Sequence, residues 1–235
     1  MPNLQIRSYE KELLDQDNIP FSDIRVTMSE LNTINALLGG HSITRKGVQY
    51  FLSNYASVRP FTIAEIGCGG GDNLVAINKY ITSHTQQRAD LIGIDIKEEC
   101  IHFAAQHVPA DTVLICSDYR TTQWPSGKPH VIFSSLFCHH FTDEQMIEQL
   151  QWLKGNSQLG FFINDLHRHP VAYHSIRVLT KLFSKSYLVR NDGPLSVARS
   201  FRRADWVRLL EAAGIKNYTI TWHWAFRFLV CVHHA

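Results

Sequence analysis

Residues 63–74 read IAEIGCGGGDNL and place four glycines, at positions 67, 69, 70 and 71, between an apolar run and a helical pattern. Glycine adopts positive φ without strain and lets a ligand approach the main chain closely. In an open α/β sheet, ligands bind beyond the carboxyl ends of the strands, where the strand order reverses. This stretch therefore predicts a strand, a tight turn that holds a nucleotide-like ligand, and a helix.

The spacing of these glycines separates several classes of nucleotide site. A dinucleotide fingerprint reads GxGxxG, and a Walker loop ends in GK followed by Ser or Thr. Here the pattern is GxGxG, Glu65 precedes it, and Asp72 follows it. The spacing therefore disfavours a nicotinamide-dependent oxidoreductase and excludes a Walker loop.

After residue 60, short apolar runs alternate with helical patterns. This rhythm predicts a parallel sheet with helices on both faces, joined by right-handed crossovers. The expected strands are 61–67, 89–96, 111–118, 130–137 and 159–166, followed by two strands within 217–234. The expected helices between them are 72–84, 98–108, 142–156 and 203–214.

Two segments depart from this rhythm. In residues 1 to 58 we expect one helix capped by Ser22 and ending at the glycines 39 and 40, and a second helix capped by Thr44. Residues 171–189 predict a long helix, and 190–201 predict a loop. We therefore expect an N-terminal helical cap at 1–58 and a main domain at 59–235 with a lid insertion at about 167–199.

The composition describes an ordinary globular protein. Of 235 residues, 45% are hydrophobic and 19% are charged. The polar N-terminus lacks the apolar stretch of a signal peptide, and no apolar run is long enough to span a membrane. Five scattered cysteines without a CxxC pair favour a reduced, cytoplasmic chain, and a net charge of +2 does not indicate nucleic-acid binding.

The glycine turn and the later strand ends together resemble class I S-adenosylmethionine-dependent methyltransferases, over about residues 60–235. The resemblance implies a Rossmann-like α/β fold with a seven-stranded, mostly parallel sheet whose last strand is antiparallel. It implies S-adenosyl-L-methionine as the cofactor and S-adenosyl-L-homocysteine as the product. EIGCGGG looks like the methionine-binding loop of the family, with Gly67, Gly69 and Gly71 against the cofactor and Glu65 near its ammonium group.

The same resemblance implies cofactor contacts at the later strand ends. Asp95 ends the second strand 24 residues after Gly71, where the family places an acid on the ribose hydroxyls. Asp118 ends the third strand, where the family reads the adenine amino group. The expected cofactor-binding set also includes Ile96, Tyr119 and Ser134. A turn without a ligand and solvated strand ends are the alternatives, and the glycines and acids taken together favour a ligand.

Histidines follow two of the strands and suggest a catalytic base. A phenol or a quinol ring carbon gains from a group that removes its proton during methyl transfer. We expect His139 or His167 to act as that base, with Asp165 orienting one of them. The alternatives are that the histidines after the fourth strand shape the pocket wall and that His169 satisfies loop carbonyls. No metal site is expected, because no HExxH motif or acidic cluster accompanies His167 and His169.

The flanking segments are similar to those of bacterial ubiquinone/menaquinone-type methylases that act on secondary metabolites. This similarity implies a small, lipophilic, hydroxylated acceptor (a phenol, polyketide or quinol) and O-methylation. C-methylation of a quinol ring and non-catalytic S-adenosylmethionine binding are the alternatives. The absence of a [DN]PPY motif argues against the usual amino-methylating nucleic-acid enzymes of this fold.

Residues 167–203 are basic, with eight Lys or Arg residues and one acid, Asp192. Arg177, Lys181 and Lys185 recur every four residues, which places them on one face of a helix. Such a face can contact an anionic membrane surface or an acidic carrier protein weakly. We expect instead a solvated lid helix whose apolar side closes the pocket, and we expect Trp222 and Trp224 to pack inside. The oligomeric state stays open.

Overall fold

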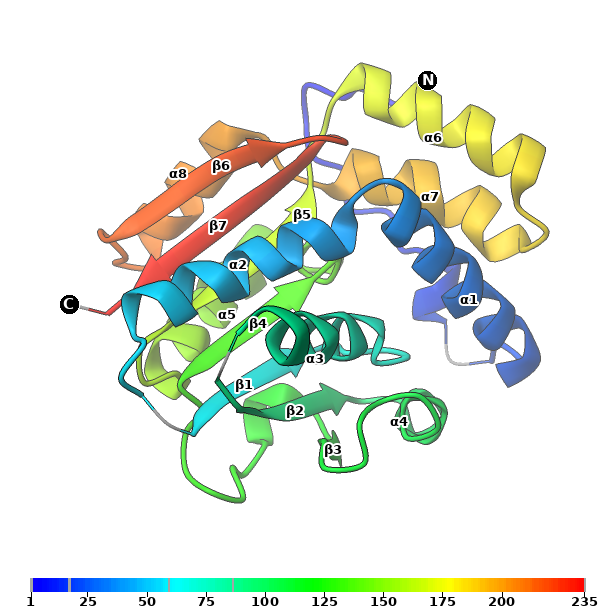
Figure 1. The fold of residues 1–235 in the computed structure, drawn as a ribbon. Helices are drawn as coiled ribbons and strands as arrows, with labels where there is room; N and C mark the ends of the chain where they lie inside the picture. Colours follow the sequence, from blue (N-terminus) through cyan, green and yellow to red (C-terminus); the bar gives the residue numbers. More distant parts are fainter. Residues whose placement is uncertain (1, 17, 59, 86, 235) are drawn as a thin grey trace.

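A seven-stranded sheet runs through the centre of the computed structural model, which describes residues 2–16, 18–58, 60–85 and 87–234 (Figure 1). The strand order is β3-β2-β1-β4-β5-β7-β6. The strands are β1 (Phe61–Ile66), β2 (Ala89–Asp95), β3 (Val113–Cys116), β4 (Val131–Ser135), β5 (Gly160–Leu166), β6 (Tyr218–His223) and β7 (Arg227–His233).

The topology confirms the predicted fold class. Strands β1 to β5 are parallel, whereas β7 lies antiparallel between β5 and β6. The chain moves outward from β1 through β2 to β3 and then returns to β4 on the other side of β1. The strand order therefore reverses between β1 and β4, and ligands bind at this position in sheets of this kind.

Helices cover both faces of the sheet, as the alternating pattern predicts (Figure 1). On one face Phe51 packs on Phe162, with ring centroids 6.3 Å apart. On the other face Trp206 packs on Phe201, with centroids 4.2 Å apart. The first face carries α2 (Gly40–Asn54) and α3 (Asp72–His84), the second carries α5 (Asp143–Asn156) and α8 (Arg203–Ala212), and α4 (Glu98–Ala104) lies beside β2 and β3.

The N-terminal segment supplies η1 (Leu13–Asp15), α1 (Phe21–Leu37) and α2. The second helix begins at Gly40 rather than at the predicted cap Thr44, because Gly39 adopts a φ of 76° and turns the chain directly from α1 into α2. Buried Ile24 and Met28 of α1 pack against Cys100 of α4. This contact brings α1 over the carboxyl ends of the strands.

Residues 170–199 differ from the prediction. They form two helices, α6 (Pro170–Phe183) and α7 (Tyr187–Arg199), where one long helix and a loop were expected. The first helix ends before Ser186, which caps α7 by accepting a hydrogen bond from the backbone N–H of Val189. Buried Leu188 and Val197 anchor α7, so the helix continues through Pro194. In the described part of the chain, no helix is long and apolar enough to cross a membrane.

Candidate active site

The candidate site is a cavity of about 880 Å³ at the carboxyl ends of β1, β2 and β4. Its floor is the glycine turn between β1 and α3. Its walls come from the N-terminal segment, α1, the loops that follow β2, β3 and β4, and α5. The cavity therefore lies where the strand order reverses, and it collects residues that are far apart in the sequence.

The glycine turn needs glycine for both conformation and space. Gly67, Gly69 and Gly71 have φ values of 66°, 51° and 79°, which strain any residue with a Cβ. A Cβ at position 67 would lie 2.4 Å from the ring of Phe137. No described atom lies within 4 Å of a Cβ built at Gly69, which lines the cavity. The main chain is thus open to a ligand at Gly69.

Glu65 lies under the turn with an incomplete set of hydrogen bonds. Its side chain is buried, and Asn73 Nδ2 donates to Oε1 at 2.8 Å. The other carboxylate oxygen, Oε2, is buried without a hydrogen-bond partner among the described residues. Burial raises the pKa of Glu65 well above its ordinary value, although the hydrogen bond from Asn73 opposes this shift. An ammonium group of a ligand would supply both the missing donor and a compensating charge.

Asp95 supports the turn from the end of β2. Its Oδ2 accepts a hydrogen bond from Gly69 N, and its Oδ1 accepts one from Lys97 N, both at 2.9 Å. Burial raises its pKa, and these two backbone donors partly offset the shift. Each oxygen keeps a further lone pair for a ligand hydroxyl. The next residue, Ile96, is 68% exposed and lines the cavity, so it offers an apolar surface beside the carboxylate.

Asp118 caps a short 3-10 helix, η2 (Tyr119–Thr121), after β3. Both of its oxygens accept hydrogen bonds from Arg120 Nε, at 3.0 and 3.1 Å, and the Arg120 guanidinium holds the pKa of the carboxyl below its ordinary value. A ligand amino group would share this carboxylate with Arg120. Tyr119 is buried on the cavity wall, with its ring edge-on to Trp152 at 5.0 Å.

Ser134 lies on the core side of β4. Its side chain is fully buried, with Oγ 3.3 Å from Cys138 Sγ. The neighbouring Ser135 and Leu136 line the cavity, whereas Ser134 does not. The one-residue difference follows from the alternation of side chains along a strand. The end of β4 therefore reaches the cavity through Ser135 and Leu136 rather than through Ser134.

The two histidines expected as bases lie outside the cavity wall. His139, in the 3-10 helix η3 (Cys138–His140), is buried, and its Nδ1 donates to Asp165 Oδ1 at 2.8 Å. His167 packs edge-on to Phe228 and accepts a hydrogen bond from Trp222 Nε1 at 3.2 Å. Burial, together with nearby cationic groups, lowers the pKa of His167 to about 4. Neither His139 nor His167 is among the residues that line this cavity.

His140 is the histidine that lines the cavity. Its Nδ1 lies 2.9 Å from Asp15 Oδ1, and the carboxylate must be the acceptor of this hydrogen bond. Burial alone would raise the pKa of Asp15, but the hydrogen bond and charge of His140 outweigh it and hold the pKa below its ordinary value. Asp15 thus orients the ring, and Nε2 lies 3.9 Å from Glu12 Oε2.

Glu12, His139 and His140 bring their ligand-type atoms within 4.8 Å of one another. Arg199 Nε lies 3.8 Å from Glu12 Oε1, and Ser196 Oγ donates to the same oxygen at 2.8 Å. Burial raises the pKa of Glu12 to about 7. The guanidinium already supplies positive charge where a cation would bind, so the group forms a buried ion network. The sequence pattern does not reveal this network, because Glu12 lies 127 and 128 residues before His139 and His140.

Comparisons with known proteins agree with this geometry. Residues 63–156, from β1 to the end of α5, match a family model described as a methyltransferase domain. No curated protein matches the sequence. Because the domain match begins in β1, it includes the glycine turn and the cavity walls that follow β2, β3 and β4.

Solved structures share the fold over most of the chain. The plantazolicin methyltransferase BpumL in complex with SAH has a TM-score of 0.67 at 20% identity, covering 89% of this chain and 90% of that one. The magnesium protoporphyrin IX methyltransferase ChlM from Synechocystis PCC 6803 with bound SAH has a TM-score of 0.57 at 14% identity, covering 94% and 90%. A putative O-methyltransferase from Nostoc punctiforme PCC 73102 has a TM-score of 0.59 at 10% identity, covering 87% and 59%.

Proposed function

We propose that this chain is an S-adenosylmethionine-dependent methyltransferase that methylates a hydroxyl group of a small acceptor with an apolar body. The methyltransferase domain matched at residues 63–156 and the fold shared with methyltransferases of known structure support this proposal. The cofactor supplies a methyl group on a positively charged sulfur, which a nucleophile displaces. The chain has to bind the two partners in line, exclude water and accept the proton of the hydroxyl.

The cofactor half of the cavity supports this assignment. Glu65 Oε2, which has no hydrogen-bond partner among the described residues, fits the cofactor ammonium. The main chain at Gly69, which no described side chain covers, fits the methionine portion of the cofactor. Asp95 and the exposed Ile96 fit the ribose hydroxyls and the flat adenine ring. We retain Asp118 and Tyr119 as the residues at the adenine end, because both line the same cavity.

The pair formed by His140 and Asp15 carries the assignment of hydroxyl chemistry. It is a histidine oriented by a carboxylate on the wall of the cavity, which is the arrangement a general base needs. The lining of the cavity also includes Leu14, Met28 and Phe141, which fit an apolar acceptor body. A carboxylate acceptor would need no base, so the pair favours a hydroxyl with a proton to remove.

The similar structures leave the acceptor open. Their names include a plantazolicin methyltransferase, a magnesium protoporphyrin IX methyltransferase and a putative O-methyltransferase. These names cover acceptors of different chemistry. The choice of a hydroxylated acceptor therefore rests on the cavity of this chain, and product analysis separates it from C-methylation of a quinol ring.

The test is a screen with methyl-labelled cofactor against phenols, quinols and hydroxy acids, followed by kinetics of His140→Gln on the best acceptor. We expect an O-methylated product and a fall in kcat of about 10²- to 10⁴-fold at neutral pH, with the affinity for S-adenosylhomocysteine unchanged. His167→Gln is the matched control and should keep full turnover, because His167 lies outside the cavity. Full turnover by His140→Gln, or a methylated ring carbon, would overturn the assignment.

A further inference from the structure

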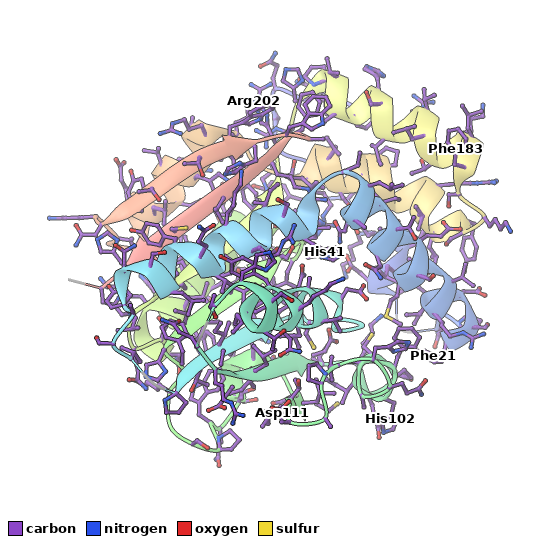
Figure 2. All side chains as sticks on the ribbon, viewed as in Figure 1. Phe21, His41, His102, Asp111, Phe183 and Arg202 are labelled. Carbon is purple, nitrogen blue, oxygen red and sulfur yellow. The ribbon has the colours of Figure 1, made fainter. Side chains whose placement is uncertain are left out.

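The helix α6 carries an apolar stripe on its outer surface. Val171, Ser175, Val178 and Leu182 recur at the spacing that lines one face of a helix, and Leu179 lies beside them. The four apolar members of this group are exposed, and Leu182 is 68% exposed. The stripe continues to Phe183, which is 77% exposed at the outer end of α6 (Figure 2).

This stripe does not close the cavity, contrary to the expectation for a lid helix. A neighbouring face of α6, with buried Ala172 and Thr180, packs on α7. A Cβ at Gly193 of α7 would lie 3.3 Å from Thr180 and 3.4 Å from Ile176, so the two helices are in close contact there. Of the residues between 167 and 199, only Arg199 lines the cavity. The apolar side of α6 therefore faces outward.

Exposed tryptophans adjoin the N-terminal end of the stripe. The rings of His169 and Phe226 stack at 5.0 Å, which places the turn between β6 and β7 beside the start of α6. Trp222 and Trp224 flank this turn, and Trp224 is 70% exposed. Both were expected to pack inside, and the structure shows that this expectation was wrong. The exposed apolar surface thus extends from Trp224 along α6 to Phe183.

Positive charge borders the stripe, and one carboxylate, that of Glu30, lies close to it at Lys185. Arg177, Lys181 and Lys185 are exposed, and none forms an ion pair within the described ranges. The acid of this segment, Asp192, is buried and accepts hydrogen bonds from the backbone of Leu13 and Leu14. Glu30 of α1 contacts the turn between α6 and α7, where Ser184 Oγ and two backbone N–H groups occupy its oxygens.

We propose that α6 and the tryptophan turn dock on an anionic lipid surface, with the apolar stripe in the lipid and the three basic side chains at the headgroups. An amphipathic helix with exposed aliphatic residues, interfacial tryptophans and flanking Lys or Arg has the composition of an interfacial helix. A second copy of the chain is a poor occupant, because a two-fold contact would bring the same basic side chains together. An acidic protein would match the charge but leave Leu182 and Phe183 without apolar partners.

The test is co-sedimentation of the full chain with vesicles of phosphatidylcholine, alone or with about one third phosphatidylserine. We expect binding to the mixed vesicles, weakened by salt, and little binding to the neutral ones. The substitutions Arg177→Gln, Lys181→Gln and Lys185→Gln together should lower binding at least about tenfold. The combination of Lys79→Gln, Lys128→Gln and Lys216→Gln removes the same charge elsewhere and should bind as the parent chain does.

The apolar part of the proposal has its own variant, Leu182→Ser with Phe183→Ser, matched by the exposed pair Val75→Ser and Val113→Ser. The first pair should abolish vesicle binding, and the second should not. Unchanged affinity for S-adenosylhomocysteine verifies that each variant is folded. Equal binding to both vesicle types, or full binding by the Leu182 and Phe183 variant, would overturn the proposal. A dimer in solution that this variant dissociates would assign the stripe to a second copy instead.

Discussion

At the scale of single residues, Glu65 offers the most direct test of the proposed cofactor. A buried carboxylate with one unpartnered oxygen is costly until a donor arrives. If the ammonium group of the cofactor binds at Glu65 as proposed, Glu65→Gln should weaken binding of S-adenosylhomocysteine by about tenfold or more, because the charge that attracts the ammonium is lost. Isothermal titration calorimetry measures the change directly.

A cofactor analogue makes this prediction specific. S-adenosylhomocysteine without its amino group has no ammonium to face Glu65, so Glu65→Gln should leave the affinity for this analogue nearly unchanged. An equal loss for both ligands would mean that Glu65 acts only by supporting the turn through Asn73. The comparison thus isolates one pair of charges from the rest of the site.

Glu12 gives a prediction about pH. Burial raises its pKa to about 7 in the folded chain, from an ordinary value of 4.5. The folded state then holds a proton that the unfolded state releases, so this group makes the free energy of unfolding fall as pH rises from about 4.5 to about 7. In Glu12→Gln this contribution is absent, so the free energy of unfolding should fall less across this window than in the parent chain. The difference is at most about 3 kcal/mol.

Urea denaturation of the parent chain and of Glu12→Gln at several pH values between 4.5 and 8 measures this difference. Glu10→Gln, an exposed neighbour on the same segment, should follow the parent profile. Parallel profiles for all three proteins would show that Glu12 is ionised in the folded state with its charge fully compensated by Arg199 and the histidines.

At the scale of elements, the junction of the glycine turn with α3 depends on one glycine. Gly71 has a φ of 79°, and a Cβ there would lie 2.5 Å from Val108 and 3.3 Å from Ala104. Gly71→Ala should lower the free energy of unfolding by about 2–4 kcal/mol, from backbone strain together with overpacking. Adding Val108→Ala should recover the part of the lost free energy of unfolding that comes from overpacking. The part that comes from backbone strain should remain.

Chemical denaturation of these variants separates the two contributions. Gly155→Ala is the control, because Gly155 lies inside α5 at negative φ with open space around it among the described residues. That substitution should be neutral or stabilise by about 0.5–1 kcal/mol. A Gly71→Ala protein as stable as the parent would mean that the turn can adopt another conformation.

The sequence predicted those helices and strands whose characteristic pattern lies within the element itself. Strands such as β1 and β4 are buried on both faces, so they read as short apolar runs between turn residues. The segment 170–199 gave the wrong helix boundaries because Asn191, Asp192 and Gly193 are common in loops. The helix α7 forms because its buried side chains pack against other elements. The local sequence pattern does not indicate this packing.

At the scale of the whole molecule, the contrast between local patterns and contacts made by distant segments also applies to the cavity. It separates the residues at the strand ends from those near His140. Residues such as Asp95 and Asp118 were predictable because parallel strands bring their carboxyl ends to one edge. The partners of His140 were not, because Asp15 and Glu12 reach it from the other end of the chain. The topology alone places the first group, whereas the second depends on how the N-terminal segment folds over the sheet.

The boundary expected near residue 58 makes a final prediction about the whole molecule. Residues 1–58 do not pack separately, because Phe51 of α2 is fully buried in the same apolar cluster as Phe133 and Phe162 of the sheet. Asn164 of β5 also donates hydrogen bonds to Gly40 O and Thr44 Oγ1 of α2, at 3.1 and 3.0 Å. We expect the full chain to unfold in one cooperative transition.

Calorimetry and two optical probes should report the same midpoint for the full chain, and S-adenosylhomocysteine at about 100 times its Kd should stabilise it by about 2.7 kcal/mol. A chain that starts at Pro60 loses α2 and exposes the rings of Phe133 and Phe162, so it should aggregate or lack a cooperative transition. The substitution Phe51→Ala in the full chain is the milder form of the same test and should cost about 3–5 kcal/mol. A stable, cofactor-binding fragment from Pro60 onward would show instead that α2 is an appendage, because the remaining sheet would then fold without the helix that covers this face.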